Sequence, residues 1–318
     1  MPKKKSAGGK ETLKVVIVND LEGISGIDHW HQLLHGFEEF EEVGRTEVTE
    51  DVNAAIRGLR AAGATEIRVA DSHGSGGPNK NIIPERLEEG VKLYQEQSIP
   101  DRMTEAVDET VDAAVLIGFH AMADTKDGLF RHTITIGPRI EVNGRPVGET
   151  ALDAYILAEY GIPVIMATGD QALVREALEF LPGIETVQVK TSTDSKTTDC
   201  LPLSEARKLI EEAAERALSK LDEFSPVQVS KPVRIDVTFP KKEQVVLCEN
   251  IPGAEKSAEM TISYTADEWD EAYKFIRTCV GFAGQFLNSK LVEKLRALPG
   301  SESAVSEWAE EIVEEWLT

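Results

Sequence analysis

Carboxylates and histidines stand where several apolar runs of this sequence end. Lys14–Val18 is rich in β-branched residues without polar alternation, which is typical of a central strand of a parallel sheet. Asp20 and Glu22 follow two residues apart, so an extended backbone would send both side chains to the same side. Ligands of open α/β sheets bind outside the carboxyl ends of the strands, and two acids placed there could hold a cation. An Asx-turn beside a solvated glutamate would explain the same residues.

The arrangement is repeated at two later apolar runs. Glu66–Ala70 ends in Asp-Ser-His, whose histidine is His73. Ala113–Phe119 ends in His120. Core histidines are common, but a histidine at a third successive strand end favours a site. Imidazole together with carboxylate ligands favours zinc.

Two further candidates follow, one on each side of a predicted hairpin. His132 opens a short alternating segment, and Glu149 opens a helix behind the turn dipeptide Asn143-Gly144. An acid in a first helical turn is also expected from the helix dipole alone. Five of the six collected residues could bind two zinc ions that share a carboxylate, whereas one catalytic zinc takes three or fewer protein ligands. We therefore expect two metals, which could hold a hydroxide between them and polarise a carbonyl. The six residues are Asp20, Glu22, His73, His120, His132 and Glu149.

The elements that must position these residues alternate between strand and helix. Thr46–Ala62 is amphipathic and predicts a helix, and Pro163–Ala167 predicts a strand with a helix behind it. A long amphipathic helix is expected over Leu203–Leu221. This alternation predicts an α/β fold with a three-layer α/β/α domain and a mainly parallel sheet.

The last third of the chain predicts a smaller α+β domain. Three strands are expected, then a helix over 266–282 and two final helices. The strands are expected at 233–239, 244–248 and 258–264, and the final helices at 289–297 and 302–317. We divide the chain into a disordered basic tail (1–12), a metal-binding catalytic α/β domain (13–222) and an α+β C-terminal domain (232–318).

Composition limits the possible partners. Lys and Arg total 34 against 56 Asp and Glu, a net charge of −22 that argues against nucleic acid and anionic membranes as partners. The three cysteines are far apart and form no CxxC, so neither a disulfide framework nor a cysteine zinc site is expected. The sequence has no secretory signal and no apolar stretch of membrane-span length, and we expect a cytoplasmic, soluble protein.

Four short motifs resemble those of the D-aminopeptidases related to the peptidase of the bacterial dipeptide-transport operon, a zinc metallopeptidase family. NDLEGISG is similar to the family's opening motif, ADSHG to its DSH element, IGFHA to its GxHA element, and NGRPVGE to its hairpin-and-glutamate element. Their order and spacing agree over roughly residues 13–221.

The resemblance implies a role for each residue. Asp20 would bridge two zinc ions, with Glu22 and His120 completing one zinc and His73 and Glu149 the other, and His132 would be catalytic. It also implies a homo-oligomer, the ring-shaped decamer of the family. This chain departs from the pattern by an N-terminal extension, an acidic insertion around 29–42, a longer C-terminal tail and one extra residue between His120 and His132.

The resulting hypothesis is a binuclear zinc aminopeptidase that hydrolyses the first peptide bond of short peptides with an N-terminal D-residue. His132 would serve as general base or acid, or as nucleophile. Asn143 and Lys190 are weaker candidates for substrate contacts. The alternatives are another metal-dependent hydrolase acting on amides or L-peptides, and a non-catalytic peptide-binding accessory protein. A Rossmann-type nucleotide binder is disfavoured, because GSGG after His73 lacks the GxGxxG spacing.

Overall fold

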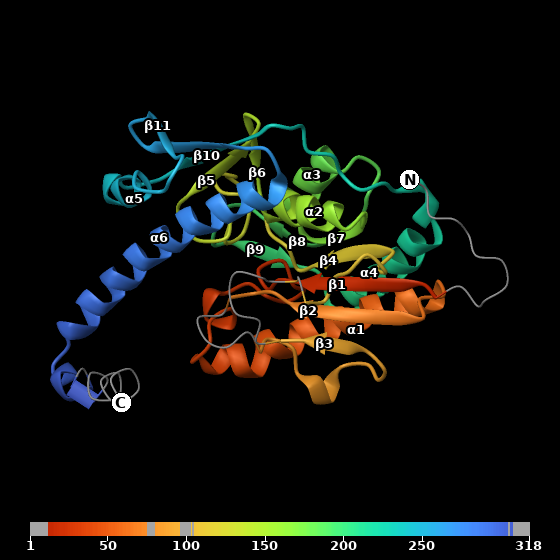
Figure 1. Cartoon of the computed structure of the whole chain (residues 1–318). Helices are drawn as coiled ribbons and strands as arrows, with labels where there is room; N and C mark the ends of the chain where they lie inside the picture. Colours follow the sequence, from red (N-terminus) through yellow and green to blue (C-terminus); the bar gives the residue numbers. More distant parts are fainter. Residues whose placement is uncertain (1–11, 75–79, 96–102, 104, 305, 308–318) are drawn as a thin grey trace, which may run out of the picture.

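A seven-stranded sheet forms the centre of the chain, in a computed structural model that describes residues 12–74, 80–95, 103, 105–304 and 306–307. The strand order is β3-β2-β1-β4-β7-β8-β9, and every pairing is parallel except that of β8 with β9 (Figure 1). The strands are β1 (Lys14–Asn19), β2 (Glu66–Asp71), β3 (Lys92–Tyr94), β4 (Ala113–Ile117), β7 (Val164–Asp170), β8 (Glu185–Ser192) and β9 (Thr198–Cys200).

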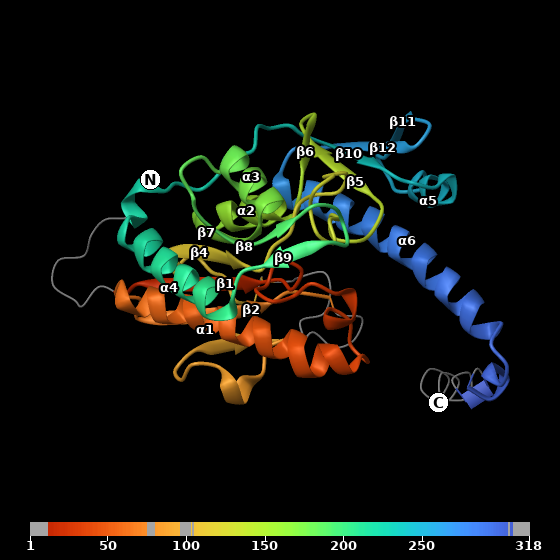
Figure 2. The same ribbon diagram turned by 180° about the vertical axis from the view of Figure 1, so that it is seen from behind.

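Helices cover both faces of this sheet, which confirms the predicted three-layer α/β/α domain. α1 (Arg45–Ala61) and α4 (Leu203–Ser219) pack on one face, and α2 (Glu149–Glu159) and α3 (Gln171–Phe180) on the other (Figure 2). Along β1, Val15 and Ile17 enter the core under α1 and α4, while Val16 and Val18 enter the core under α2. The strand is apolar throughout because both of its faces are buried.

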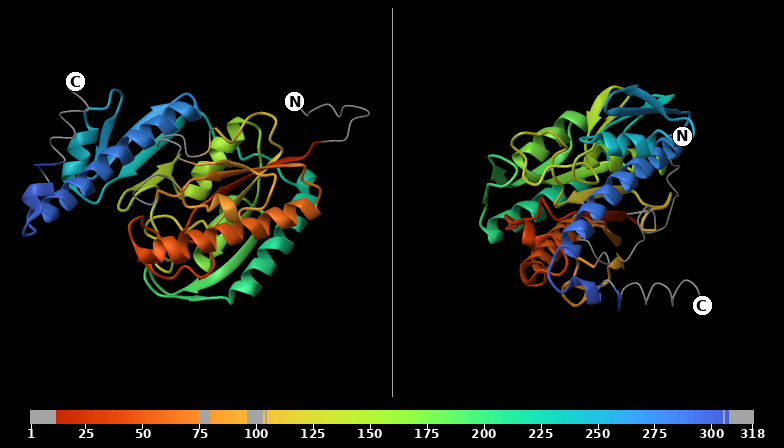
Figure 3. Two further views of the ribbon diagram at one scale, coloured as in Figure 1. Left: turned by 90° about the horizontal axis from the view of Figure 1, so that it is seen from below. Right: turned by 90° about the vertical axis from the view of Figure 1, so that its left-hand side faces the viewer.

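A second, antiparallel sheet carries the α+β part of the fold. Its order is β11-β12-β10-β5-β6, so the hairpin that precedes Glu149 belongs to this sheet and not to the first. Figure 3 shows α6 running from this sheet as one long helix past the edge of the fold. The elements are β5 (Arg139–Val142), β6 (Arg145–Val147), β10 (Val233–Thr238), β11 (Glu255–Ala258), β12 (Thr261–Ala266), α5 (Lys242–Cys248) and α6 (Trp269–Arg296).

Short helical turns complete the described elements. They are η1 (Trp30–Gln32), η2 (Phe40–Gly44), η3 (Pro84–Arg86) and η4 (Leu221–Glu223). Within the described ranges, no helix has the length and apolar character needed to cross a membrane.

Several local predictions were wrong. Residues 244–248 form the helix α5, because Gln244, Val245 and Cys248 are buried at helical spacing while the two residues between them are exposed. The separate helix expected at 289–297 is the continuation of α6. The short alternating segment that His132 opens, expected over His132–Ile136, forms no strand, and Thr133 and Thr135 make an isolated bridge there. The basic tail predicted at 1–12 and the helix predicted at 302–317 lie largely outside the described residues.

Candidate metal centre

The six predicted residues meet at one edge of the parallel sheet. Asp20 and Glu22 follow β1, His73 follows β2, and His120 follows β4. These three strands are neighbours, so their carboxyl ends bring the side chains together. Glu149 is the first residue of α2 and His132 lies in the loop before β5. All six side chains are buried except that of His132, which is 16% exposed.

Short distances link the side chains in one cluster. His73 Nδ1 lies 2.9 Å from Asp20 Oδ1 and 3.2 Å from Glu22 Oε2. On the other side, His120 Nε2 lies 3.2 Å from Glu149 Oε1 and 3.4 Å from Asp20 Oδ2. Asp20 therefore uses one oxygen toward each histidine.

His132 completes the cluster, and its ring packs against the face of the His120 ring. The two imidazole rings stack with centroids 4.1 Å apart. His132 Nε2 lies 3.7 Å from Glu149 Oε1 and 4.0 Å from Glu22 Oε1. The nitrogen thus faces the same carboxylates as the other two histidines.

Three overlapping groups in the described chain have the geometry of a metal site. Within each group the candidate ligand atoms lie within 4.8 Å of one another. Asp20 belongs to two of the groups, as expected of a shared carboxylate. In these groups His73 stands with Glu22, while His120 stands with Glu149 in one group and with Glu22, as the family resemblance implied, in another. The groups are Asp20–Glu22–His73, Asp20–His120–Glu149 and Glu22–His120–His132.

Backbone carbonyls determine which nitrogen of each histidine is free. His73 Nε2 lies 3.0 Å from Leu33 O, His120 Nδ1 lies 3.0 Å from Ala121 O, and His132 Nδ1 lies 2.8 Å from Phe130 O. A carbonyl only accepts, so each of these nitrogens carries the hydrogen. When a ring is neutral, its opposite nitrogen then presents a lone pair to the cluster, as in metal-binding histidines. Leu33 lies in the acidic insertion, which therefore contributes to the site.

The cluster attracts positive charge. Burial opposes protonation of His120, but the surrounding carboxylates, chiefly Glu149, outweigh it and raise the pKa of His120 to about 10. Burial also opposes protonation of His73, yet Glu22 and Asp20 hold its pKa well above the ordinary value. Burial alone would raise the pKa of Glu22, and the neighbouring histidines nevertheless keep it well below its usual range. In a cluster of this kind a cation stabilises the ionised carboxylates.

His132 differs from the other two histidines. Burial and the nearby charge of His120 lower the pKa of His132. Its imidazole is therefore neutral near pH 7 and can accept a proton.

The donor set fits zinc. Two buried atoms of the cluster, Glu22 Oε2 and His120 Nε2, make no hydrogen bond of acceptable geometry with any described residue. Buried polar atoms are normally satisfied, so these two atoms point to a missing partner. Imidazole nitrogen and carboxylate oxygen are the ligands that zinc accepts at short range.

Gly23 allows the loop after β1 to approach the loop after β4. The Gly23 N–H donates to Gly118 O at 2.8 Å, and a Cβ at Gly23 would lie 1.9 Å from Phe119 O. No side chain fits there. The loop with Glu22 consequently packs directly on the backbone that leads to His120.

Two residues outside the six collected ones hold the loops after β1 and β2: Asp71, and Lys190, which the sequence suggested as a candidate for substrate contact. Asp71 is fully buried and accepts hydrogen bonds from the N–H groups of Asn81 and Ile82, and the Asn81 side chain also donates to His73 O. Lys190 Nζ is buried and donates to Glu22 O at 2.9 Å and to Ile27 O at 2.6 Å. Lys190 thus supports the Glu22 loop, a role that the sequence analysis missed.

Other histidines and Asn143 lie outside the cluster. His31 pairs with Glu39 at 3.6 Å and His35 with Glu41 at 3.3 Å, and neither joins a ligand group of the described chain. Asn143 adopts a positive φ of 51° in the hairpin turn and bonds Ser230 O and the Arg234 N–H. Its role is structural.

Comparison with known proteins points to one family. The family model described as D-aminopeptidase matches residues 13–278. A curated D-aminopeptidase of Bacillus subtilis (strain 168) is 31% identical over 264 residues, which cover 82% of this chain and 94% of that protein. The structure of DppA from Bacillus subtilis, a Zn-dependent D-aminopeptidase described as a self-compartmentalizing protease, matches with a TM-score of 0.80 at 30% identity. The match covers 85% of this chain and 98% of DppA.

Proposed function

This chain belongs to the D-aminopeptidase family, and from that premise we propose that it is a zinc-dependent aminopeptidase that removes an N-terminal D-residue from short peptides. The observation that carries this proposal is the buried cluster of three carboxylates and three histidines. Its ligand groups overlap at Asp20, an arrangement suited to paired cations.

We assign the ligands by the groups that the side chains form. Asp20 would be shared between two zinc ions, with Glu22 and His73 completing one and His120 and Glu149 the other. The family resemblance instead pairs Glu22 with His120 and His73 with Glu149, and the group of Glu22, His120 and His132 allows the first of these pairs. Zinc bound there supplies a Lewis acid for the scissile carbonyl and lowers the pKa of a water molecule. The backbone carbonyls behind the rings would fix the tautomers of the histidines and orient their lone pairs toward the zinc ions.

His132 is assigned to proton transfer. It has the most exposed side chain of the three histidines and a lowered pKa, so Nε2 can take a proton near neutral pH. The Phe130 carbonyl accepts from Nδ1 and stabilises the ring once it is protonated.

A homo-oligomer fits this activity. DppA is described as self-compartmentalizing, and by family resemblance we propose that copies of this chain assemble into a ring-shaped decamer around their sites. We also infer a cytoplasmic location. Light scattering on the zinc-loaded protein would give the mass of the assembly, and a monomer would contradict this part of the proposal.

The experiment that tests the activity compares D-Ala-D-Ala with L-Ala-L-Ala. Protein loaded with zinc and protein treated with chelator are assayed for release of the N-terminal residue. We expect zinc-dependent cleavage of the D-dipeptide. Cleavage of the L-dipeptide alone would refute the D-specificity and favour a general metallopeptidase. Cleavage of neither would favour a peptide-binding protein.

A further inference from the structure

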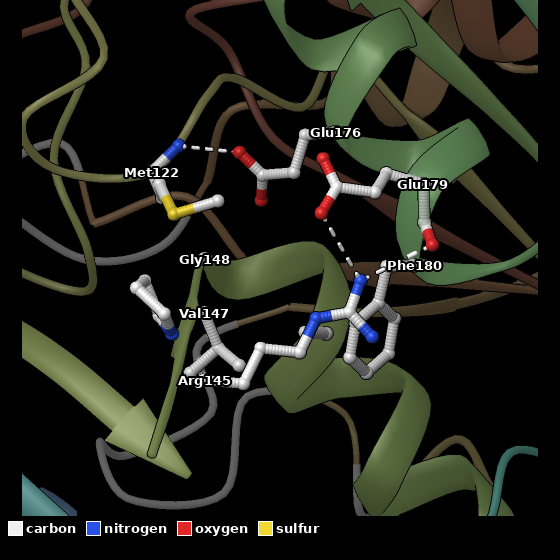
Figure 4. Close-up of a pocket in the computed structure, with 9 residues that line it drawn as sticks. Met122, Arg145, Val147, Gly148, Glu176, Glu179 and Phe180 are labelled. Atoms are coloured by element: carbon white, nitrogen blue, oxygen red, sulfur yellow. Dashed lines mark hydrogen bonds and ion pairs between the residues drawn. The ribbon is translucent and has the colours of Figure 1, made fainter.

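The carboxylate of Glu176 lies next to the metal centre without belonging to it. Glu176 stands on α3 and is 8% exposed. Its Oε2 accepts a hydrogen bond from the Met122 N–H at 2.7 Å, while Oε1 has no hydrogen-bond partner among the described residues (Figure 4). Burial raises the pKa of Glu176 to about 7. Burying a carboxyl group with one oxygen unpaired lowers the free energy of unfolding.

No ion pair within the described chain explains this acid. Arg145, the cation among the residues that line the pocket of Figure 4, is engaged elsewhere, because it pairs with Glu179 at 3.6 Å and lies over the Phe180 ring at 4.8 Å. The pocket beside Glu176 is small, with room for little more than a water molecule. Water can enter such a space and satisfy Oε1, but it would not account for the bond from Oε2 to the backbone.

Glu176 contacts both of the chain segments that present His120 and Glu149. Met122 follows His120 by two residues, and Gly148 directly precedes Glu149. A Cβ built on Gly148 would lie 2.2 Å from Glu176 Oε1. Gly148 has a φ of −102°, which any residue can adopt, so it is the neighbouring side chains and not the backbone conformation that require glycine. The built Cβ would also lie 2.9 Å from the Cβ of Met122, the residue bonded to Glu176.

One peptide group connects Glu176 to the tautomer of His120. The Ala121 carbonyl, 3.0 Å from His120 Nδ1, and the Met122 N–H, bonded to Glu176, belong to the same planar peptide. Rotation of that plane would break both contacts together. Glu176 therefore fixes the carbonyl that keeps the hydrogen of His120 on Nδ1 and leaves Nε2 to the cluster.

We propose that Glu176 is a positioning residue for the metal centre, which orients His120 through the Ala121–Met122 peptide and sets the path of the chain into Glu149 through Gly148. The inference rests on the proposed zinc site. Glu176 acts through the chain segments of His120 and Glu149 and does not contact the substrate.

The test compares Glu176→Gln with Glu176→Leu. Glutamine keeps an oxygen that can accept from the Met122 N–H, whereas leucine fills a similar volume without an acceptor. Zinc affinity is measured by competition with a chromogenic chelator, and the melting temperature is measured on zinc-free protein. We expect glutamine to retain zinc affinity close to that of the wild type. We expect leucine to lose roughly 10–100-fold, the usual effect of removing a group that orients a ligand.

The melting temperature separates positioning from folding. Leucine removes a buried acid but also leaves the Met122 N–H without its acceptor, and these two effects on the free energy of unfolding oppose each other. The zinc-free leucine variant should therefore melt close to the wild type, although it binds zinc more weakly. Glu179→Leu is the matched control, since Glu179 lies one turn further along α3 with a side chain that is 80% exposed. This control should keep its zinc affinity.

Gly148→Ala tests the same contact from the other side, should the leucine variant not fold. Its Cβ would meet the carboxylate, and zinc affinity should again fall. Wild-type zinc affinity in either Glu176→Leu or Gly148→Ala would overturn the proposal. Equal losses in the leucine and glutamine variants would also overturn it. A wild-type protein that binds zinc but cleaves no peptide would instead refute the proposed function and leave this test valid.

Discussion

The buried amine of Lys190 gives a prediction whose size follows from the structure. Lys190 is 1% exposed, and its Nζ donates to the carbonyls of Glu22 and Ile27. Burial lowers the pKa of Lys190 from 10.5 to about 8. Lys190→Met keeps an unbranched apolar chain and removes the titrating group.

The pH dependence follows from proton linkage. Between pH 8 and 10.5 the unfolded chain keeps a proton on Lys190 that the folded chain has lost, so the free energy of unfolding rises with pH. Below pH 8 both states are charged, and above pH 10.5 both are neutral. A difference of 2.5 pKa units (10.5 minus 8) corresponds to about 3 kcal/mol. The wild type should gain about this much relative to Lys190→Met across the interval.

Urea unfolding of zinc-free protein at fixed concentration measures this difference. Each protein is unfolded at several pH values from 7.5 to 11, an interval chosen to bracket both pKa values. Lys208→Met is the control, because the Lys208 side chain is 74% exposed and its removal should leave the pH dependence unchanged. Parallel curves for the wild type and Lys190→Met would refute the reasoning that Lys190 titrates inside the fold.

Three further substitutions test how the site is held. Gly23→Ala should destabilise the fold by about 1–3 kcal/mol and weaken zinc binding, because its Cβ would meet Phe119 O, and urea unfolding identical to wild type would contradict this. Asp71→Asn should lower the free energy of unfolding, measured in urea, by roughly 1–3 kcal/mol, because an NH2 group would replace one of the two buried acceptor oxygens and leave its donors without a partner. His132→Ala should lose most turnover in a steady-state assay while zinc content is unchanged, and a parallel loss of zinc would make His132 a ligand.

The gathering of the site residues was predictable from the sequence. Parallel strands end at the same edge of a sheet, and the apolar runs before Asp20, His73 and His120 marked three such ends. Their assignment as zinc ligands and that of His132 as a catalytic group stay predictions, which the experiments above test.

Contacts between distant parts of the chain were not predictable. Lys190 lies inside β8 and, unlike Asp20, His73 and His120, does not follow the end of a strand. Its partners lie 168 and 163 residues away and are carbonyls. Glu176 lies within an ordinary amphipathic helix, and nothing in the sequence marks its bond to Met122. The pairing of His73 with Glu22 likewise depends on loop conformation, which strand periodicity does not define.

The number of zinc ions per chain tests the central claim most directly. Protein dialysed against zinc and then against metal-free buffer is analysed for zinc by mass spectrometry, for the wild type and for His73→Ala. The account predicts two zinc ions per chain in the wild type. It predicts one in His73→Ala, because the group of Asp20, His120 and Glu149 remains intact. A single zinc in the wild type would contradict the assignment of Asp20 as a ligand shared by two metals. Two zinc ions in His73→Ala would contradict the assignment of His73 as a ligand.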